Sequence, residues 1–180
     1  DNIMDSEDSS CNELIHKFPQ TLLEYREAYR KAGLDNAYTE YFDAAWPVFK
    51  KMCSRCYIPP EDYSQMQINP CHCDFHAGNF KYLPDGTICG SFDYDMAKFD
   101  SRLFEIGLAM HYVFASWKMA SNGIIRLDRM ERFIRLYDQE IIRIGKIPPL
   151  SRLEKDYLYE VLIQGTAYVY GWCTSAVVYN

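Results

Sequence analysis

Three side chains within a stretch of twenty residues have the types that phosphoryl transfer requires. Asp74 and Asn79 lie in one short run, and Asp93 follows fourteen residues after Asn79. Moving a phosphoryl group from ATP to a hydroxyl requires a carboxylate that accepts the hydroxyl proton and oxygen ligands for the metal ion that neutralises the phosphates. Asp74 fits the first role. Asn79 and Asp93 fit the second, because Mg²⁺ prefers carboxylate and amide oxygens.

A predicted β-hairpin connects these residues. The segment from Phe80 to Phe92 carries residues that favour strands on both sides of Asp85-Gly86, and an Asp-Gly pair is a strong signal for a tight turn. Such a hairpin would return Asp93 to the vicinity of Asn79. We therefore expect the three side chains to form one site.

The pattern H-x-D-x-x-x-x-N, followed by an acidic residue behind an aromatic one, resembles the catalytic and metal-binding loops of the aminoglycoside phosphotransferase and choline kinase superfamily. In that superfamily the catalytic loop typically reads H-G-D-x-H-x-x-N, and here it begins at His72. The resemblance implies that Asp74 is the catalytic base and that His72 is a structural member of the catalytic loop. It also implies that Asn79 and Asp93 bind Mg²⁺ and, through it, ATP. Asp95 would support a second metal ion.

Two positions depart from the family pattern. Cys73 stands where the family usually has Gly, so it adds a side chain beside Asp74 and bears on the shape of the acceptor pocket. Glu105 stands where an Asp commonly begins the next helix, which keeps the charge and lengthens its reach. His76 lies inside the motif, but we place the chemistry on Asp74.

The resemblance implies a fold as well as a chemistry. Members of the superfamily are small-molecule kinases with two lobes, and the N-terminal lobe holds the phosphates of ATP. No glycine-rich phosphate-binding motif occurs among the nine glycines of this chain. We therefore expect a protein-kinase-like C-terminal lobe without the N-terminal lobe. An acidic linker with a possible short helix would cover 1–18 and the helical lobe 19–180, with a catalytic loop at 71–80 and a metal loop at 92–95.

Helical periodicity surrounds the predicted site. The predicted helices run over 19–33, 35–56, 105–120, 128–145 and 151–180. Pro47 should kink or split the second of them, because proline lacks the N–H that a helix interior uses. Capping-box patterns occur at Ser10, Asp128 and Ser151. The expected fold class is α+β, mostly α, with one small β-hairpin at the active site.

Composition and charge bear on whether the protein binds nucleic acid or membrane. The net charge is −6 and the isoelectric point is about 5.2, whereas nucleic-acid-binding proteins usually carry a basic stripe. Polar residues interrupt the apolar segment from Val161 to Tyr179, so it is predicted to be a buried helix rather than a membrane span. No secretory signal is recognisable. These observations predict a cytoplasmic protein that binds neither nucleic acid nor membrane.

The seven cysteines form an odd set, which argues for reduced thiols rather than a disulfide framework. One alternative is a four-thiolate zinc site made by Cys53-x-x-Cys56 and Cys71-x-Cys73. Closing such a site would constrain the loop that carries Asp74. We therefore regard the zinc site as the weaker interpretation.

The expected function is an ATP- and Mg²⁺-dependent kinase that phosphorylates a hydroxyl of a small molecule, such as an amino alcohol, an amino sugar or an aminoglycoside. The chain alone is expected to be inactive, because half of the phosphate clamp lies outside it. Two alternatives are a non-catalytic kinase-like binding protein and a zinc-stabilised interaction module. Aromatic residues of the last helix, such as Tyr168 and Trp172, are predicted to be core residues first and ammonium-binding faces second. His16 and His111 are predicted to be packing or surface residues.

Overall fold

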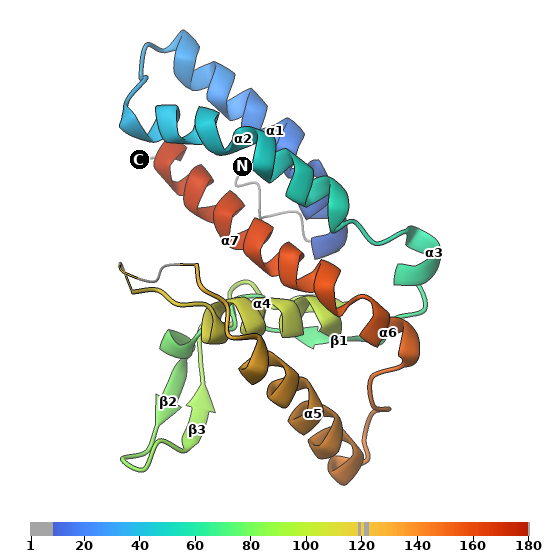
Figure 1. Ribbon diagram of the computed structural model, residues 1–180. Coiled ribbons are helices and arrows are strands. Elements are labelled where there is room, and N and C mark those ends of the chain that lie inside the picture. The colour runs from blue at the N-terminus through green and yellow to red at the C-terminus, as the bar shows by residue number, and fades with distance from the viewer. Residues whose placement is uncertain (1–8, 119, 121–122, 180) are drawn as a thin grey trace.

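The computed structural model describes residues 9–118, 120 and 123–179, which form an α+β fold made mostly of helices (Figure 1). The helices are α1 (Cys11–Lys31), α2 (Ala37–Arg55), α3 (Pro60–Tyr63), α4 (Arg102–Phe114), α5 (Leu127–Ile144), α6 (Arg152–Asp156) and α7 (Leu158–Tyr179). The strands are β1 (Ile68–Cys71), β2 (Phe80–Tyr82), β3 (Ile88–Ser91) and β4 (Lys98–Ser101), and a short 3-10 turn, η1, covers Ala77–Asn79. The predicted class, mostly helical with a small hairpin, is confirmed.

The first two helices continue through their prolines. The Ser10 side chain accepts a hydrogen bond from the Glu13 amide and starts α1, so the predicted cap and the predicted helix after it are one element with Pro19 inside. This helix runs across the boundary that we predicted between residues 18 and 19. Helix α2 likewise contains Pro47 without being divided. Packing of an apolar face outweighs the single backbone bond that each proline removes.

The predicted caps have different outcomes. Ser151 and Glu154 form both bonds of a capping box at α6. The predicted cap at Asp128 is wrong, because α5 begins at Leu127 and Asp128 forms an ion pair with Arg126 at 3.1 Å. Helix α4 occupies 102–114 rather than the predicted 105–120, because the Ser101 side chain caps it three residues earlier.

Two antiparallel strand pairs clamp the loops that carry the predicted site. The predicted hairpin is confirmed, since β2 pairs with β3 and places Phe80 opposite Ser91. Strand β1 pairs with β4 and places Cys71 opposite Lys98. The chain between Cys71 and Phe80 and the chain between Ser91 and Lys98 are therefore held together at both ends.

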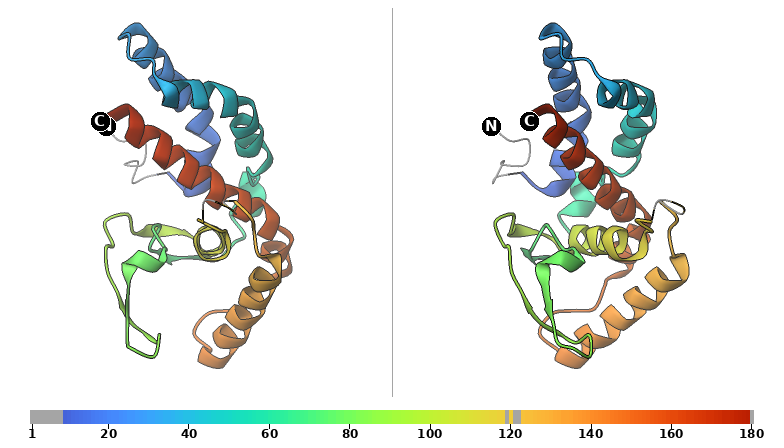
Figure 2. Two further views of the ribbon diagram at one scale, coloured as in Figure 1. Left: turned by 60° about the vertical axis from the view of Figure 1, so that its left-hand side comes forward. Right: turned by 90° about the vertical axis from the view of Figure 1, so that its left-hand side faces the viewer.

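Helix α7 is the central element of the fold. It lies between α4 and the pair formed by α1 and α2, and both views of Figure 2 place β2, β3 and α5 beyond α4. A Cβ atom added at Gly107 on α4 would lie 2.1 Å from the Val161 carbonyl oxygen on α7. The two helices therefore cross in backbone contact, which only glycine permits at that position.

Helix α7 also settles the prediction for the apolar C-terminal segment. Val161, Gln164 and Ala167 are buried between the neighbouring helices, as a core helix requires. Among the residues that the structure describes, no helix combines the length and the apolar character needed to span a bilayer.

Candidate functional site

Asp74 and Asn79 form a direct pair in the predicted catalytic loop. The Asn79 Nδ2 atom donates to Asp74 Oδ2 at 2.9 Å and to the Asp74 main-chain carbonyl at 3.0 Å. Asn79 is buried, whereas about one third of the Asp74 side chain is exposed at 32%. The amide therefore fixes the orientation of a carboxylate that still faces solvent.

Asp74 and Asp93 face one cavity of about 570 Å³. The predicted hairpin thus brings the metal loop back to the catalytic loop. The cavity is lined by residues from the two loops and from α4 and α7: Cys73, Asp74, His76, Ala77, Gly78, Asp93, Met96, Tyr112, Trp117, Tyr168 and Trp172. Asp95 is exposed and is not one of them, so the structure does not bring it into the cavity.

His72 joins the two loops from behind. Its ring is buried, and its Nε2 atom lies 2.9 Å from the carbonyl oxygen of Phe92, the residue before Asp93. A carbonyl only accepts hydrogen bonds, so Nε2 carries the proton in this contact. The ring also packs against Tyr94 at a centroid distance of 4.5 Å. This geometry gives His72 a positioning role rather than contact with a reacting group.

His76 is closer to the chemistry than we expected from the sequence. Its Nδ1 atom accepts a hydrogen bond from the Gly78 amide at 3.0 Å, which leaves the proton on Nε2. That Nε2 atom lies 3.4 Å from Asp74 Oδ2. The same carboxylate oxygen therefore faces both the Asn79 amide and the His76 ring.

Two residues of the site have left-handed backbone conformations. Cys73 has φ 60° and Asp93 has φ 66°. Residues other than glycine rarely adopt this region, and each instance costs about 1–3 kcal/mol. This strain explains why glycine would be favourable at the position of Cys73. It also implies that contacts with the surrounding structure hold both loops in place.

Glu105 supplies part of that hold. Its Oε2 atom accepts a hydrogen bond from the Cys73 amide at 3.3 Å, and the His72 amide donates to the same carboxylate. Burial raises the pKa of the Glu105 carboxyl, although the two amides oppose the shift. The longer side chain at this position therefore still reaches the strained loop.

Replacing Glu105 with Gln should change how stability depends on pH. The raised pKa means that Glu105 stabilises the fold most when it is protonated, below its unfolded value of 4.5, and that this contribution is lost as the pH rises through the folded-state pKa. Gln does not titrate, so the stability of the variant relative to the wild type should increase with pH across that window. Urea denaturation of both proteins at a series of pH values measures this, and a constant difference would contradict it.

The described residues allow a test of the metal predictions. No group of three or more His, Cys, Asp or Glu side chains is placed to hold a metal among them. The four-thiolate zinc site is therefore wrong: Cys53 and Cys56 end α2, and no cluster joins them to Cys71 and Cys73. A magnesium site is less demanding, because Mg²⁺ keeps several waters and needs only one or two protein carboxylates. Asn79 and Asp93 fit that requirement by donor type.

Aromatic residues also line this cavity. Tyr112 and Trp117 stack at a centroid distance of 6.0 Å, and Trp117 Nε1 donates to the Tyr112 carbonyl at 3.0 Å. Tyr168 is buried as predicted for a core residue, whereas Trp172 is 52% exposed and lines the cavity. The sequence analysis did not predict that Tyr112 and Trp117 belong to the site. The only sequence feature that could have indicated it is the occurrence of two aromatic residues near the end of a predicted helix. His111, predicted to be a packing or surface residue, packs its ring against that of Trp117.

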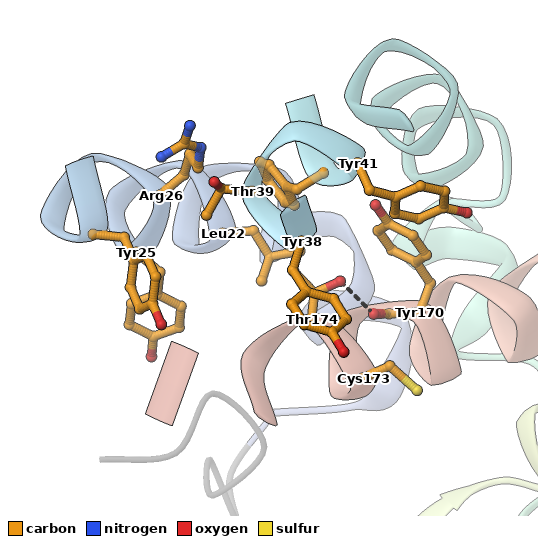
Figure 3. Close-up of a pocket in the computed structure, with 11 residues that line it drawn as sticks. Leu22, Tyr25, Arg26, Tyr38, Thr39, Tyr41, Tyr170, Cys173 and Thr174 are labelled. Carbon is orange, nitrogen blue, oxygen red and sulfur yellow. Dashed lines mark hydrogen bonds between the residues drawn. The ribbon is translucent and has the colours of Figure 1, made fainter. Parts of the chain in front are cut away.

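A second cavity of about 290 Å³ lies among α1, α2 and the C-terminal part of α7 (Figure 3). Tyrosines of α1 and α2 supply much of its wall, and Tyr170, Cys173 and Thr174 supply the α7 side. None of the predicted catalytic or metal-binding residues lines it. Helix α7 contributes different residues to the two cavities, Tyr168 and Trp172 to the cavity of Asp74 and Tyr170, Cys173 and Thr174 to this one.

No protein-family model, curated protein or solved structure matches the chain.

Proposed function

We propose that the chain is the catalytic C-terminal lobe of an ATP- and Mg²⁺-dependent kinase that acts on a hydroxyl of a small molecule. The observation that supports this best is that Asp74, oriented by the buried Asn79 amide behind it, lines a cavity together with Asp93. A positioned carboxylate and oxygen ligands on one cavity are what phosphoryl transfer to a hydroxyl needs.

In this proposal Asp74 accepts the proton of the acceptor hydroxyl. Its Oδ2 atom is held by Asn79 at 2.9 Å and faces His76 at 3.4 Å, so the carboxylate keeps one orientation while it remains accessible. Asn79 and Asp93 are the residues that would hold Mg²⁺, which neutralises phosphate charge when it is bound. His72 keeps the metal loop against the catalytic loop through the Phe92 carbonyl.

The acceptor class proposed here is a cationic amino alcohol or amino sugar. Asp74 and Asp93 give the cavity negative charge, and Trp117 and Trp172 also line it. Aromatic faces attract ammonium groups by cation–π interaction, worth about 0.5–2 kcal/mol per contact. A molecule with an ammonium group near a hydroxyl would suit both the carboxylates and the aromatic rings.

The proposal includes a phosphate-binding lobe. Positioning and neutralising the triphosphate supply most of the catalysis in this reaction class, and the chain has no glycine-rich motif for that task. We therefore expect the 180-residue chain by itself to bind Mg·ATP weakly and to show no transfer. Calorimetry with Mg·ATP and a coupled assay for ADP release test this, and tight binding or acceptor-dependent turnover would contradict it.

Replacing Asp93 with Ala tests the metal assignment in a protein that combines the chain with such a lobe. Loss of this ligand should raise the Mg²⁺ concentration needed for half-maximal activity by about tenfold or more, and lower the rate as well. ADP release is measured across a Mg²⁺ titration with choline, ethanolamine and an aminoglycoside as acceptors.

Asp95→Ala is the matched control, because Asp95 lies on the same loop and outside the cavity. Equal Mg²⁺ dependence of the wild type and the Asp93 variant would contradict the assignment. Binding of an acceptor without any ADP release would instead support the non-catalytic binding protein.

A further inference from the structure

The second cavity, of about 290 Å³, is lined by one face of α1 and one face of α2. On α1, Leu22, Tyr25 and Tyr29 follow each other at intervals of three and four residues. On α2, Tyr38 and Tyr41 are three residues apart. Such spacings place side chains on the same face of a helix. In Figure 3, Tyr25 lies at one end of the cavity and Tyr41 at the other, with Leu22 between them, so the two helices bring their rings to one shared space.

This cavity has a closed floor and an open mouth. Leu22, Thr39 and Phe42 are 1%, 5% and 6% exposed, whereas Tyr38 and Tyr41 are 68% and 69% exposed. Large aromatic side chains left in solvent beside a buried apolar floor are typical of a binding site. The volume lies near the lower end of the range of about 300–1,000 Å³ for small-molecule sites. The space therefore suits a small molecule rather than a helix of a partner protein.

The walls are held in place by contacts between the three helices. The Arg26 guanidinium of α1 donates from Nε and Nη2 to the two carboxylate oxygens of Asp43 on α2, at 2.9 Å and 2.7 Å. It also donates from Nη1 to Asp35, just before α2, at 2.6 Å. On the other side, the ring of Phe49 on α2 packs against that of Tyr170 on α7 at a centroid distance of 4.6 Å. The cavity is therefore preformed, as small-molecule sites usually are.

Charge restricts what the cavity can bind. Arg26 is the only charged side chain among the described residues that line it, and its side chain is 10% exposed. Asp35 and Asp43 already pair with that charge. A charged ligand would therefore lose its hydration without gaining a counterion in the lining, and burying an unpaired charge is costly. An uncharged ligand avoids this cost.

We propose that this cavity binds an uncharged aromatic small molecule whose ring packs against the tyrosines. Aromatic rings bury a large apolar area and attract one another in offset or edge-to-face arrangements, which a wall of several tyrosines can supply. The cavity shares none of its described lining residues with the cavity of Asp74. The proposal is therefore independent of the proposed kinase function.

Three probes that share one ring test the ligand class on the 180-residue chain. At neutral pH, benzyl alcohol is uncharged, benzylamine is a cation and benzoate is an anion. Each is titrated into protein with 13C-labelled tyrosine, and the tyrosine signals are followed by NMR. Benzyl alcohol should shift a subset of these signals to saturation, with a dissociation constant lower by about tenfold or more than those of the two charged probes. Tighter binding of either charged probe, or no saturable shift with benzyl alcohol, would overturn the proposal.

Substitutions at the mouth of the cavity locate the binding site. Tyr38→Ala combined with Tyr41→Ala removes two exposed rings and should weaken benzyl alcohol binding by about tenfold. Tyr159→Ala is the matched control, because Tyr159 is an exposed tyrosine of α7 that lines neither cavity. The control should bind as the wild type does. An equal loss in both variants would contradict the assigned site.

An alkylation assay on the wild-type chain does not depend on how well a variant folds. Cys173 is exposed and lines the cavity, whereas the exposed Cys89 of β3 does not. Benzyl alcohol should slow the reaction of Cys173 with iodoacetamide in proportion to occupancy and leave that of Cys89 unchanged, as mass spectrometry of the digest would show. Unchanged or equal rates of slowing at the two thiols would overturn the proposal.

Sedimentation velocity tests whether a second copy of the chain covers the mouth instead. We expect the wild-type chain to be monomeric at the concentrations used for the titrations. A dimer that dissociates when Tyr38 and Tyr41 are both replaced by Ala would show that these rings form an interface between copies, and it would overturn the proposal.

Discussion

Asp74→Asn is expected to lower kcat by about a hundredfold or more in a protein that combines this chain with a phosphate-binding lobe. Asn cannot accept the hydroxyl proton, but its side-chain oxygen can still accept the Asn79 hydrogen bond that Asp74 Oδ2 accepts at 2.9 Å. The fold and the affinity for Mg·ATP should therefore change little. Steady-state rates of ADP release, together with calorimetry for the nucleotide, separate these effects.

Asp85→Asn is the matched control for that substitution. Asp85 lies in the exposed turn of the hairpin, where its Oδ1 atom accepts a hydrogen bond from the Thr87 amide at 2.9 Å, and Asn can replace it there. The control should retain the wild-type kcat. A near-normal rate in the Asp74 variant would refute the role of Asp74 as base, and an equal loss in both variants would point to a general effect of charge.

The sequence was sufficient to predict the parts of the site that depend on local signals. The spacing of Asp74 and Asn79 within one loop and the Asp-Gly turn are such signals, and the structure shows the pair and the hairpin. The prediction that Asp93 returns to the vicinity of Asn79 followed from the hairpin alone, and the amide of Phe92, the residue before Asp93, donates to the Asn79 carbonyl at 3.1 Å. The roles of these residues remain predictions.

The parts that could not be predicted depend on residues far apart in the chain. The pairing of β1 with β4 closes the site from the other end, and short strands of mixed polarity give no periodic signal for such a pairing. The sequence analysis did not assign His76 a place beside Asp74. A histidine that faces a carboxylate cannot be distinguished by sequence from one that packs in the core.

A buried ion pair between Arg102 and Glu154 holds α4 against α6. No sequence motif predicted it. Arg102 begins α4, and its guanidinium donates two hydrogen bonds to Glu154 of α6, from Nε to Oε1 at 2.8 Å and from Nη2 to Oε2 at 2.7 Å. The two side chains are 4% and 2% exposed. Arg102 also donates to the carbonyls of Pro148 and Pro149, which fixes the turn before α6. Burial opposes ionisation of Glu154, but the guanidinium outweighs it and lowers the pKa of the carboxyl.

Glu154→Gln should therefore destabilise the protein by about 3–5 kcal/mol near neutral pH, because it leaves the charge of Arg102 buried without a counterion. A lowered pKa means that Glu154 stabilises the fold above its unfolded value of 4.5 and that this contribution is lost as the pH falls through the folded-state pKa. The difference between variant and wild type should consequently shrink in acid. Urea denaturation at neutral and acidic pH measures both effects.

Arg102→Met combined with Glu154→Leu provides the decisive comparison. Apolar residues of similar volume often replace a buried ion pair without loss, since they remove the desolvation penalty of both charges together. The double variant should recover most of the stability that Glu154→Gln loses. If it is as unstable as the single variant, the hydrogen bonds from Arg102 to the Pro148 and Pro149 carbonyls stabilise the turn more than the ion pair does.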